Sequence, residues 1–208
     1  MLYKTFLVSA LAAVFVTGVF AAKQIKVEKK NLIDNPGFEK VDEIVIGTND
    51  YLQRTRKQGC NLADGPIAVL PSEWVLQGSS GKIRVVEGKP GKNIYSGKHA
   101  LFMSTSKDTQ MDIYSGSFVA GPTYIISVYA RGKGAIYLRT YEYKNTTGGA
   151  CVGAPMQTFK ISDNWTKYEW IYNRQNPDAK FFNVVVGVMP GSNAYLDDVE
   201  LLKKNNLK

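Results

Sequence analysis

Apolar and polar residues alternate along most of the chain after residue 31, which is the period expected of β-strands with one buried face. The alternation is clearest in residues 123–131 (TYIISVYAR) and 135–143 (AIYLRTYEY), which the turn RGKG joins. Loops rich in Gly, Pro, Asn and Ser separate the segments, as in sandwiches and jelly rolls. Further strands are predicted at 82–87, 99–105, 110–119, 156–161, 165–173, 180–188 and 194–202. The pattern therefore predicts an all-β fold, an antiparallel β-sandwich of the jelly-roll type.

One segment departs from this pattern. Residues 41–70 combine a short strand-like EIVIG with a charged run and a Gly- and Pro-rich loop. We interpret them as an insertion or long loops within a single domain that spans residues 31–202, a length at which one core forms without metals or many crosslinks.

The first residues have the pattern of a signal peptide. Lys4 precedes an uncharged apolar stretch at residues 6–20, and small residues precede a cleavage point after Ala21. The alternative is a membrane anchor, but an apolar helix of this length reaches only about 23 Å, short of a ~30 Å hydrocarbon core. We therefore expect residues 1–21 to be removed and the protein to be secreted, extracellular or at the cell surface, with the periplasm as a further possibility.

The net charge of +8 raises the question of nucleic-acid binding. Most of the excess lies in two basic tails, residues 22–30 and 203–208, so the domain between them is close to neutral. A nucleic-acid binder gathers its cations on a folded face. We therefore expect no nucleic-acid partner, and we interpret the lysine tails as solvated segments able to contact acidic components of a cell envelope.

The two cysteines are Cys60 and Cys151, each in loop-like sequence. In an exported chain the plain expectation is a disulfide between them, which would tie two long loops together. The alternative is a catalytic thiolate. It would need a basic neighbour, and the single histidine, His99, is not placed beside either cysteine by the sequence.

Several motifs together resemble a known family. NLIDNPGFEK at residues 31–40 and AYLDDVELL at 194–202 bracket the domain, and PSEW, SGKHALFM, FVAGPTYIISVYARG and WTKYEWIY follow in order between them. They resemble the carbohydrate-binding modules of families 4, 9 and 22, which are galactose-binding-domain-like jelly rolls. The resemblance implies a module that binds a polysaccharide or another glycan without transforming it.

The resemblance also implies a structural calcium ion between the first and last strands. Glu39 and Asp197 are the expected ligands, with backbone carbonyls of Asn35 and of residues 96–98 completing the shell. Asp198 is the next candidate, although strand alternation directs it away from Asp197. The alternative is that Glu39 and Asp197 cap loops or pair with lysines.

Sugars bind to flat apolar rings flanked by planar polar groups. If residues 123–131 and 135–143 are neighbouring strands, they share one face that carries such groups. The predicted ligand-binding residues are Tyr129, Arg131, Tyr137, Arg139 and Tyr141. The alternative is ordinary cross-strand packing beneath the 41–70 segment.

Tryptophan and histidine receive structural interpretations. The resemblance implies that Trp74 and Trp165 pack inside the sandwich, whereas Trp170 lines either the core or the end of the groove. His99 begins a predicted strand, and no Cys, Asp or Ser stands at a spacing that would form a catalytic group with it, so we interpret it as structural.

A glycosidase would need two carboxylates across a cleft, and Glu142 and Glu169 are the available pair. Both alternate with the aromatic residues and so fall on the aliphatic face or at strand ends. The sequence also lacks a phosphate loop, a nucleophile elbow and a metal-hydrolase motif. It therefore favours a non-catalytic binding protein. The alternative function is a structural or adhesive envelope protein that uses the same fold for protein contacts.

Overall fold

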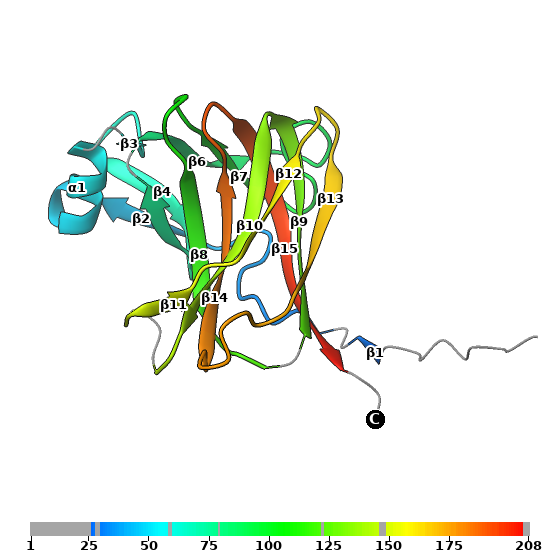
Figure 1. Cartoon of the computed structure of the whole chain (residues 1–208). Coiled ribbons are helices and arrows are strands. Elements are labelled where there is room, and N and C mark those ends of the chain that lie inside the picture. The colour runs from blue at the N-terminus through cyan, green and yellow to red at the C-terminus, as the bar shows by residue number, and fades with distance from the viewer. Residues whose placement is uncertain are drawn as a thin grey trace, which may run out of the picture.

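The computed structural model describes residues 26–27, 30–57, 60–78, 80–121, 123–145 and 149–205. Two sheets packed face to face form the body of the molecule (Figure 1). The all-β sandwich predicted from alternation is therefore confirmed. The predicted signal peptide and the two ends of the chain lie outside the described residues. No helix in the described part of the chain has the length and apolarity to cross a membrane.

The first sheet has seven strands. Its spatial order is β13 (Thr166–Tyr172), β9 (Thr123–Lys133), β15 (Asn193–Asn205), β7 (His99–Ser104), β6 (Gly81–Glu87) and β3 (Cys60–Asn61), and β1 (Lys26–Val27) pairs with the end of β15. All its pairs are antiparallel except that of β3 with β6.

The second sheet has six strands. Its order is β11 (Cys151–Gly153), β10 (Ala135–Tyr143), β14 (Phe181–Val188), β8 (Met111–Val119) and β5 (Val75–Gly78), and β12 (Met156–Lys160) also pairs with β10. All its pairs are antiparallel.

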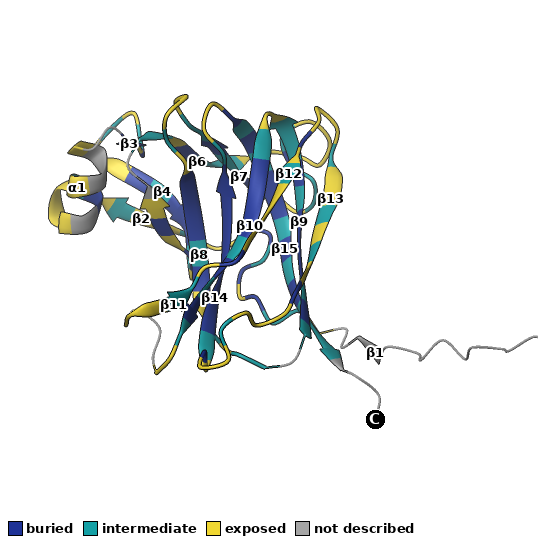
Figure 2. Ribbon diagram, viewed as in Figure 1, coloured by how far each residue is buried: buried dark blue, intermediate teal, exposed yellow. Residues whose placement is uncertain are grey.

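The aliphatic sides of the two sheets meet and form the core (Figure 2). Leu138 and Val184 of one sheet are fully buried, as are Ile126 and Leu196 of the other. Trp74 is buried in this core, as predicted. Trp170 packs against this core, and its ring centroid lies 5.3 Å from that of Tyr172. Of the two positions considered for Trp170, the structure therefore shows the core and not the end of the groove.

Residues 41–70 form a small unit at one side of the sandwich. It contains a two-stranded sheet, β2 (Val41–Val45) with β4 (Ile67–Pro71), and between them η1 (Ile46–Thr48) and α1 (Asp50–Lys57). Figure 1 shows α1 at the edge of the molecule, beyond the six-stranded sheet. The unit therefore does not lie over the tyrosine-bearing face of β10.

The turn RGKG does not join neighbouring strands. It carries the chain from β9 in one sheet to β10 in the other, and Gly132 and Gly134 have φ of 145° and 94°. A Cβ on Gly132 would lie 2.1 Å from the carbonyl oxygen of Asn193, so the crossing depends on glycine there. The expectation that residues 123–131 and 135–143 share a face is therefore wrong. Alternation assigns side chains to faces, whereas the connection decides which sheet a strand joins.

Glu142 is a structural carboxylate inside the sandwich. Its side chain is fully buried, and its oxygens accept hydrogen bonds from the Tyr172 hydroxyl (2.8 Å) and from the backbone N–H groups of Gln175 (2.8 Å) and Asn176 (2.9 Å). Glu169 is exposed on β13 of the other sheet. The two carboxylates therefore do not flank a cleft.

We expect Glu142→Ala to destabilise the protein by about 2–4 kcal/mol, because it leaves a buried hydroxyl and two backbone N–H groups without their acceptor. Thermal or urea unfolding measures the loss. The control, Glu169→Ala, removes an exposed carboxylate and should change stability by less than about 0.5 kcal/mol. Equal effects of the two substitutions would contradict the structural role of Glu142.

Candidate functional site

The outer face of the six-stranded sheet carries a concentration of aromatic and planar polar side chains. Strand register places Tyr114 of β8, Val185 of β14 and Arg139 of β10 in one row across the sheet. Tyr137 and Tyr141 flank Arg139 on the same face, because side chains two residues apart share a face. Three of the predicted ligand-binding residues, Tyr137, Arg139 and Tyr141, are thus brought together.

Tyr137 forms the floor of this face. A Cβ on Gly187 of the neighbouring strand would lie 2.4 Å from Cζ of Tyr137, so the ring lies directly over Gly187. The Tyr137 hydroxyl donates a 2.6 Å hydrogen bond to Oδ2 of Asp112 on β8, one strand further across. Tyr137 is fully buried, and it therefore supports the site from below.

Asp112 is the buried carboxylate of the face. It is only 3% exposed, and its Oδ1 has no hydrogen-bond partner among the described residues. Burial raises the pKa of Asp112 to about 6, against the lowering effects of the Tyr137 hydrogen bond and of Arg139. Burial, followed by the charge of Asp112, also raises the pKa of Tyr137 and of Tyr114. These two phenols are therefore neutral at physiological pH.

Arg139 lies between two phenol rings. Its guanidinium carbon is 4.9 Å from the centroid of Tyr137 and 5.7 Å from that of Tyr141, and Nη1 donates to the Tyr141 hydroxyl at 3.2 Å. Nη2 lies 3.1 Å from Sδ of Met156. Stacking on aromatic faces and hydrogen bonding fix the plane of the guanidinium, so its donors have a defined direction.

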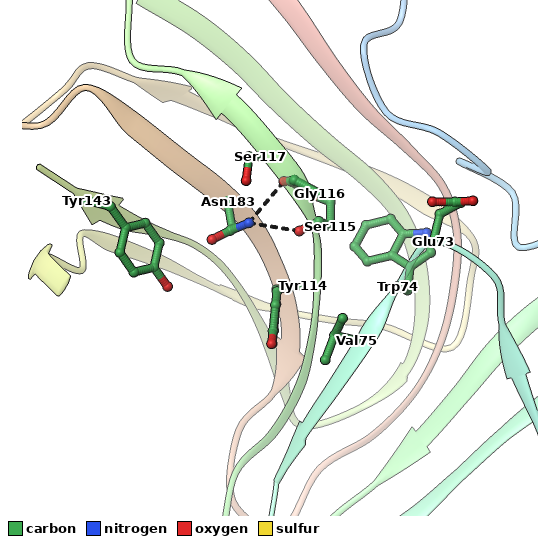
Figure 3. Close-up of a pocket in the computed structure, with 9 residues that line it drawn as sticks. All are labelled: Glu73, Trp74, Val75, Tyr114, Ser115, Gly116, Ser117, Tyr143 and Asn183. Carbon is green, nitrogen blue, oxygen red and sulfur yellow. Dashed lines mark hydrogen bonds between the residues drawn. The ribbon is translucent and has the colours of Figure 1, made fainter. Parts of the chain in front are cut away.

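A groove of about 480 Å³ opens beside these residues (Figure 3). Its lining residues are Glu73, Trp74, Val75, Tyr114, Ser115, Gly116, Ser117, Tyr143 and Asn183. Figure 3 shows Tyr114 and Tyr143 on either side of Asn183. The pKa of Tyr143 is raised, chiefly by burial and then by Cys151, so this phenol is also neutral.

A bulge in β8 fixes the amide of Asn183. The register between β14 and β8 shifts between Asn183 and Val185, and Nδ2 of Asn183 donates to the carbonyls of Ser115 (2.9 Å) and Gly116 (3.0 Å). With its amino group held by the bulge, the amide turns its oxygen the opposite way, toward the side of Tyr143 (Figure 3). The groove therefore offers a fixed acceptor between two neutral phenols.

Four residues of this face were not predicted from the sequence to belong to the site: Asp112, Tyr114, Tyr143 and Asn183. Alternation within the predicted strand 110–119 does place Asp112 and Tyr114 on one face. The sequence does not show that β8 and β10 belong to the same sheet with β14 between them. Only this strand order places Asp112 and Tyr114 on the same face as Tyr137 and Arg139.

Tyr129 and Arg131 lie apart from the other predicted residues, on the outer face of the seven-stranded sheet. Tyr95 stacks on Tyr129 with 3.7 Å between ring centroids, and Trp165 lies 5.8 Å from Tyr95. Arg131 donates to the carbonyl of Lys92. The expectation of one groove holding all five residues is therefore wrong. Trp165, half-buried and in contact with Tyr95, is also outside the core position expected for it.

The predicted disulfide does not form. Cys60 is buried on β3 and Cys151 is exposed on β11, and both are free. The two strands belong to different sheets and lie at opposite ends of the sandwich (Figure 1), so the thiols cannot meet without large backbone movement. Burial raises the pKa of Cys60 to about 11. That thiol is therefore protonated and unreactive.

Glu39 and Asp197 converge on one turn, residues 95–99. Oδ2 of Asp197 accepts from the N–H groups of Tyr95 (3.0 Å) and Ser96 (3.1 Å), and Oε1 of Glu39 accepts from those of Lys98 (2.9 Å) and His99 (3.2 Å). Burial is the main cause that raises the pKa of Asp197 to about 6. No group of three His, Cys, Asp or Glu side chains with metal-binding geometry occurs among the described residues.

Asp198 departs from the expected alternation. The register of β15 shifts between Asp197 and Glu200, and Asp198 has a φ of 45°. A Cβ on Gly37 would lie 3.1 Å from Oδ1 of Asp198 and 3.4 Å from Oδ1 of Asp197. Both carboxylates therefore approach Gly37, because the bulge turns Asp198 toward the same side as Asp197.

Comparison with known proteins supports the fold. No family model matches the chain, and no curated protein sequence matches it. Among solved structures, a Stig cyclase from Fischerella sp. TAU has a TM-score of 0.56 at 9% identity, covering 89% of this chain and 100% of that chain. At this identity the likeness shows a common fold and nothing of activity.

Carbohydrate-binding modules are also among the structural neighbours, as the sequence resemblance predicted. A family 61 module in complex with β-1,4-galactotriose has a TM-score of 0.49 at 16% identity, covering 85% of this chain and 99% of that chain. A family 4 module has a TM-score of 0.46 at 16% identity, covering 83% and 99%.

Asp112 should make stability depend on pH. Its folded pKa of about 6 is above the unfolded value near 3.9, so the stability contributed by the protonated form is full below about pH 4 and lost as pH rises through 6. Asp112→Asn keeps an acceptor for Tyr137 but cannot ionise. We expect the free energy of unfolding of the variant, relative to wild type, to rise by about 1–3 kcal/mol between pH 4 and pH 7. A difference that stays constant with pH would contradict the assignment.

Proposed function

We propose that this protein is a secreted, non-catalytic polysaccharide-binding protein whose binding surface is the outer face of the six-stranded sheet. The observation that carries the proposal is the groove between Tyr114 and Tyr143. It combines neutral phenol rings with a fixed amide acceptor, Asn183. Arg139 adds oriented donors beside it. The export pattern of residues 1–21 supports secretion.

The chemistry of the groove suits sugars. Aromatic rings contact the apolar C–H faces of a pyranose, and phenol, amide and guanidinium groups hydrogen-bond its hydroxyls. Val75 is 42% exposed and Met156 is 41% exposed, so apolar surface continues at both sides of the face. Glu73 is exposed at one end of the groove, and Asp112 is buried beneath the neighbouring row. Because these carboxylates would repel an acidic polymer, we expect the groove to bind an uncharged polysaccharide that lies across the strands.

The binding test uses the full chain against soluble and insoluble β-glucans, xylans and mannans, in pull-down and calorimetric titrations. We expect at least one polysaccharide to bind, and Tyr114→Ala or Tyr143→Ala to weaken its binding tenfold or more, about 1.4 kcal/mol. The control is Ile171→Ala, which shortens an exposed apolar side chain on β13 of the other sheet, outside the groove. It should bind as wild type does.

Two results would count against this proposal. Binding to none of the polysaccharides would remove the glycan function and leave the structural or adhesive alternative. Binding that both groove variants, Tyr114→Ala and Tyr143→Ala, retain would keep the function and remove this face as its site.

We further propose that Glu39 and Asp197 hold the predicted structural calcium ion. The supporting observation is that two carboxylates far apart in sequence meet at one turn while a third, Asp198, approaches from the same side. Asp198 also raises the pKa of Asp197, after the larger effect of burial, and a cation there would relieve this repulsion. The other oxygen of each carboxylate has one contact: Oδ1 of Asp197 accepts from the N–H of Asp198 (2.8 Å), and Oε2 of Glu39 lies 3.3 Å from Nδ1 of His99. Each of these two oxygens therefore keeps a lone pair for a cation.

After dialysis against a chelator, about 1 mM CaCl₂ should raise the melting temperature of the wild-type protein by several degrees, since an ion that binds only the folded state stabilises it. Asp197→Asn should abolish this shift. Asp64→Asn, which changes an exposed aspartate elsewhere, should preserve it. An unchanged melting temperature on adding calcium to the wild type would refute the calcium proposal.

A further inference from the structure

A second group of aromatic and cationic side chains lies on the outer face of the seven-stranded sheet. Strand register aligns Arg84, Phe102, Tyr195 and Arg131 in one row across β6, β7, β15 and β9. The next row has the order Lys82, Ser104, Asn193 and Lys133. Because residues two apart on a strand share a face, both rows belong to one surface, which we call the cationic face.

The cations stand at the corners of this face. Three strand spacings separate β6 from β9, and two residues separate the rows, so the Cα atoms of the four cationic residues mark a rectangle of about 14 Å by 7 Å. Lys82 and Lys133 are exposed, whereas Arg84 and Arg131 are half-buried and held by hydrogen bonds. Arg84 donates from Nη1 to the carbonyls of Asn61 (2.6 Å) and Ile83 (2.9 Å), and from Nη2 to the side-chain oxygens of Asn61 and Asp64. Arg131 donates from Nη1 to the carbonyl of Lys92.

The centre of the face alternates rings with small polar groups. Phe102 and Tyr195 lie 4.9 Å apart with their planes tilted by 49°, and Ser104 and Asn193 stand beside them in the next row. All four side chains are half-buried. Rings next to hydroxyl and amide groups match the C–H faces and hydroxyls of a sugar, as in the groove of the other sheet.

Carboxylates near the face only partly offset its charge. Asp64 pairs with Arg84 at 3.1 Å, and its side chain is 85% exposed, so an incoming anion can compete with it in water. Asp163 lies in the loop next to Gly132, whose N–H bonds the carbonyl of Ser162. Asp197, two residues from Tyr195 on β15, lies on the same side of the sheet, but it is fully buried and accepts from the N–H groups of Tyr95 and Ser96. The exposed charge of the two rows is therefore positive.

We propose that the cationic face is a second binding site, which takes an acidic polysaccharide whose sugars carry carboxylates. Charge complementarity selects a polyanion, and a carboxylate of the polymer can take the place of the exposed Asp64 on Nη2 of Arg84. The face lies on the opposite sheet from the groove, so one chain holds a neutral polymer on one side and an acidic polymer on the other. The protein would then act as a cross-linker of two kinds of polysaccharide, a role that rests on the proposed function of the groove as well as on this face.

A nucleic acid fits the face less well. Stacking bases need a ring that offers its flat side, whereas these two rings are tilted against each other and half-buried between strands. Nucleic-acid binders also collect more phosphate contacts than four cations provide. Nucleic-acid binding is therefore an outcome that the test must separate from the proposal.

The experiment compares polygalacturonate with the same polymer after full methyl esterification, which removes its charge but keeps its backbone. We expect the full chain to bind polygalacturonate at low salt and the esterified polymer at least fivefold more weakly. The double variant Lys82→Gln/Lys133→Gln should weaken polygalacturonate binding at least fivefold, and Tyr195→Ala should weaken it at constant charge. The control Lys203→Gln/Lys204→Gln removes two charges at the far end of β15 and should change binding less than twofold.

The polygalacturonate experiment tests the cationic face separately from the groove. Tyr114→Ala should leave polygalacturonate binding unchanged, so the cationic face can be supported even if the groove binds nothing. An equal loss in the Lys203 and Lys204 control would show binding through general charge and overturn the proposal. Equal affinity for the esterified polymer, or displacement of polygalacturonate by a single-stranded oligonucleotide at lower concentration, would also overturn it.

Discussion

The burial of one side of every long strand is the constraint on which the rest of this structure depends. Two sheets hide their aliphatic sides from water against each other, and the alternation of the backbone then forces the intervening residues outward. On β10, for example, Leu138 packs in the core, and its neighbours Tyr137 and Arg139 therefore lie on the opposite, outer face. Both candidate binding surfaces are therefore the outer faces of the two sheets whose inner faces form the core.

The fold could be predicted from the sequence more completely than the candidate site. Alternation predicted the bounds of the long late strands to within three residues, since each has one clearly apolar side. The early part was harder, because β3 and β5 are short and α1 has only two turns, too few for a helical period to stand out. The resemblance of the two bracketing motifs agreed with a fold that places Glu39 and Asp197 at one turn.

The site was only partly predictable, for a reason that lies in the topology. Residues 131–134 look like a hairpin turn, yet they cross between sheets, and this one connection separates Tyr129 from Tyr137. Asn183 became part of the groove through a bulge that no local pattern of β14 reveals. The disulfide expectation failed similarly, because loop-like sequence around two cysteines says nothing about which ends of a sandwich they occupy.

Gly187 has a consequence beyond the packing of one ring. It lacks a side chain, so Tyr137 lies flat across β14 and reaches Asp112 two strands from its own. The depth of the binding face is thus decided on a strand that presents only a hydrogen atom there. A larger residue at this position would lift the aromatic floor and make the face shallower while every polar contact residue kept its identity. Under the proposed function, affinity for polymers of different thickness can therefore be tuned from a position that does not line the groove.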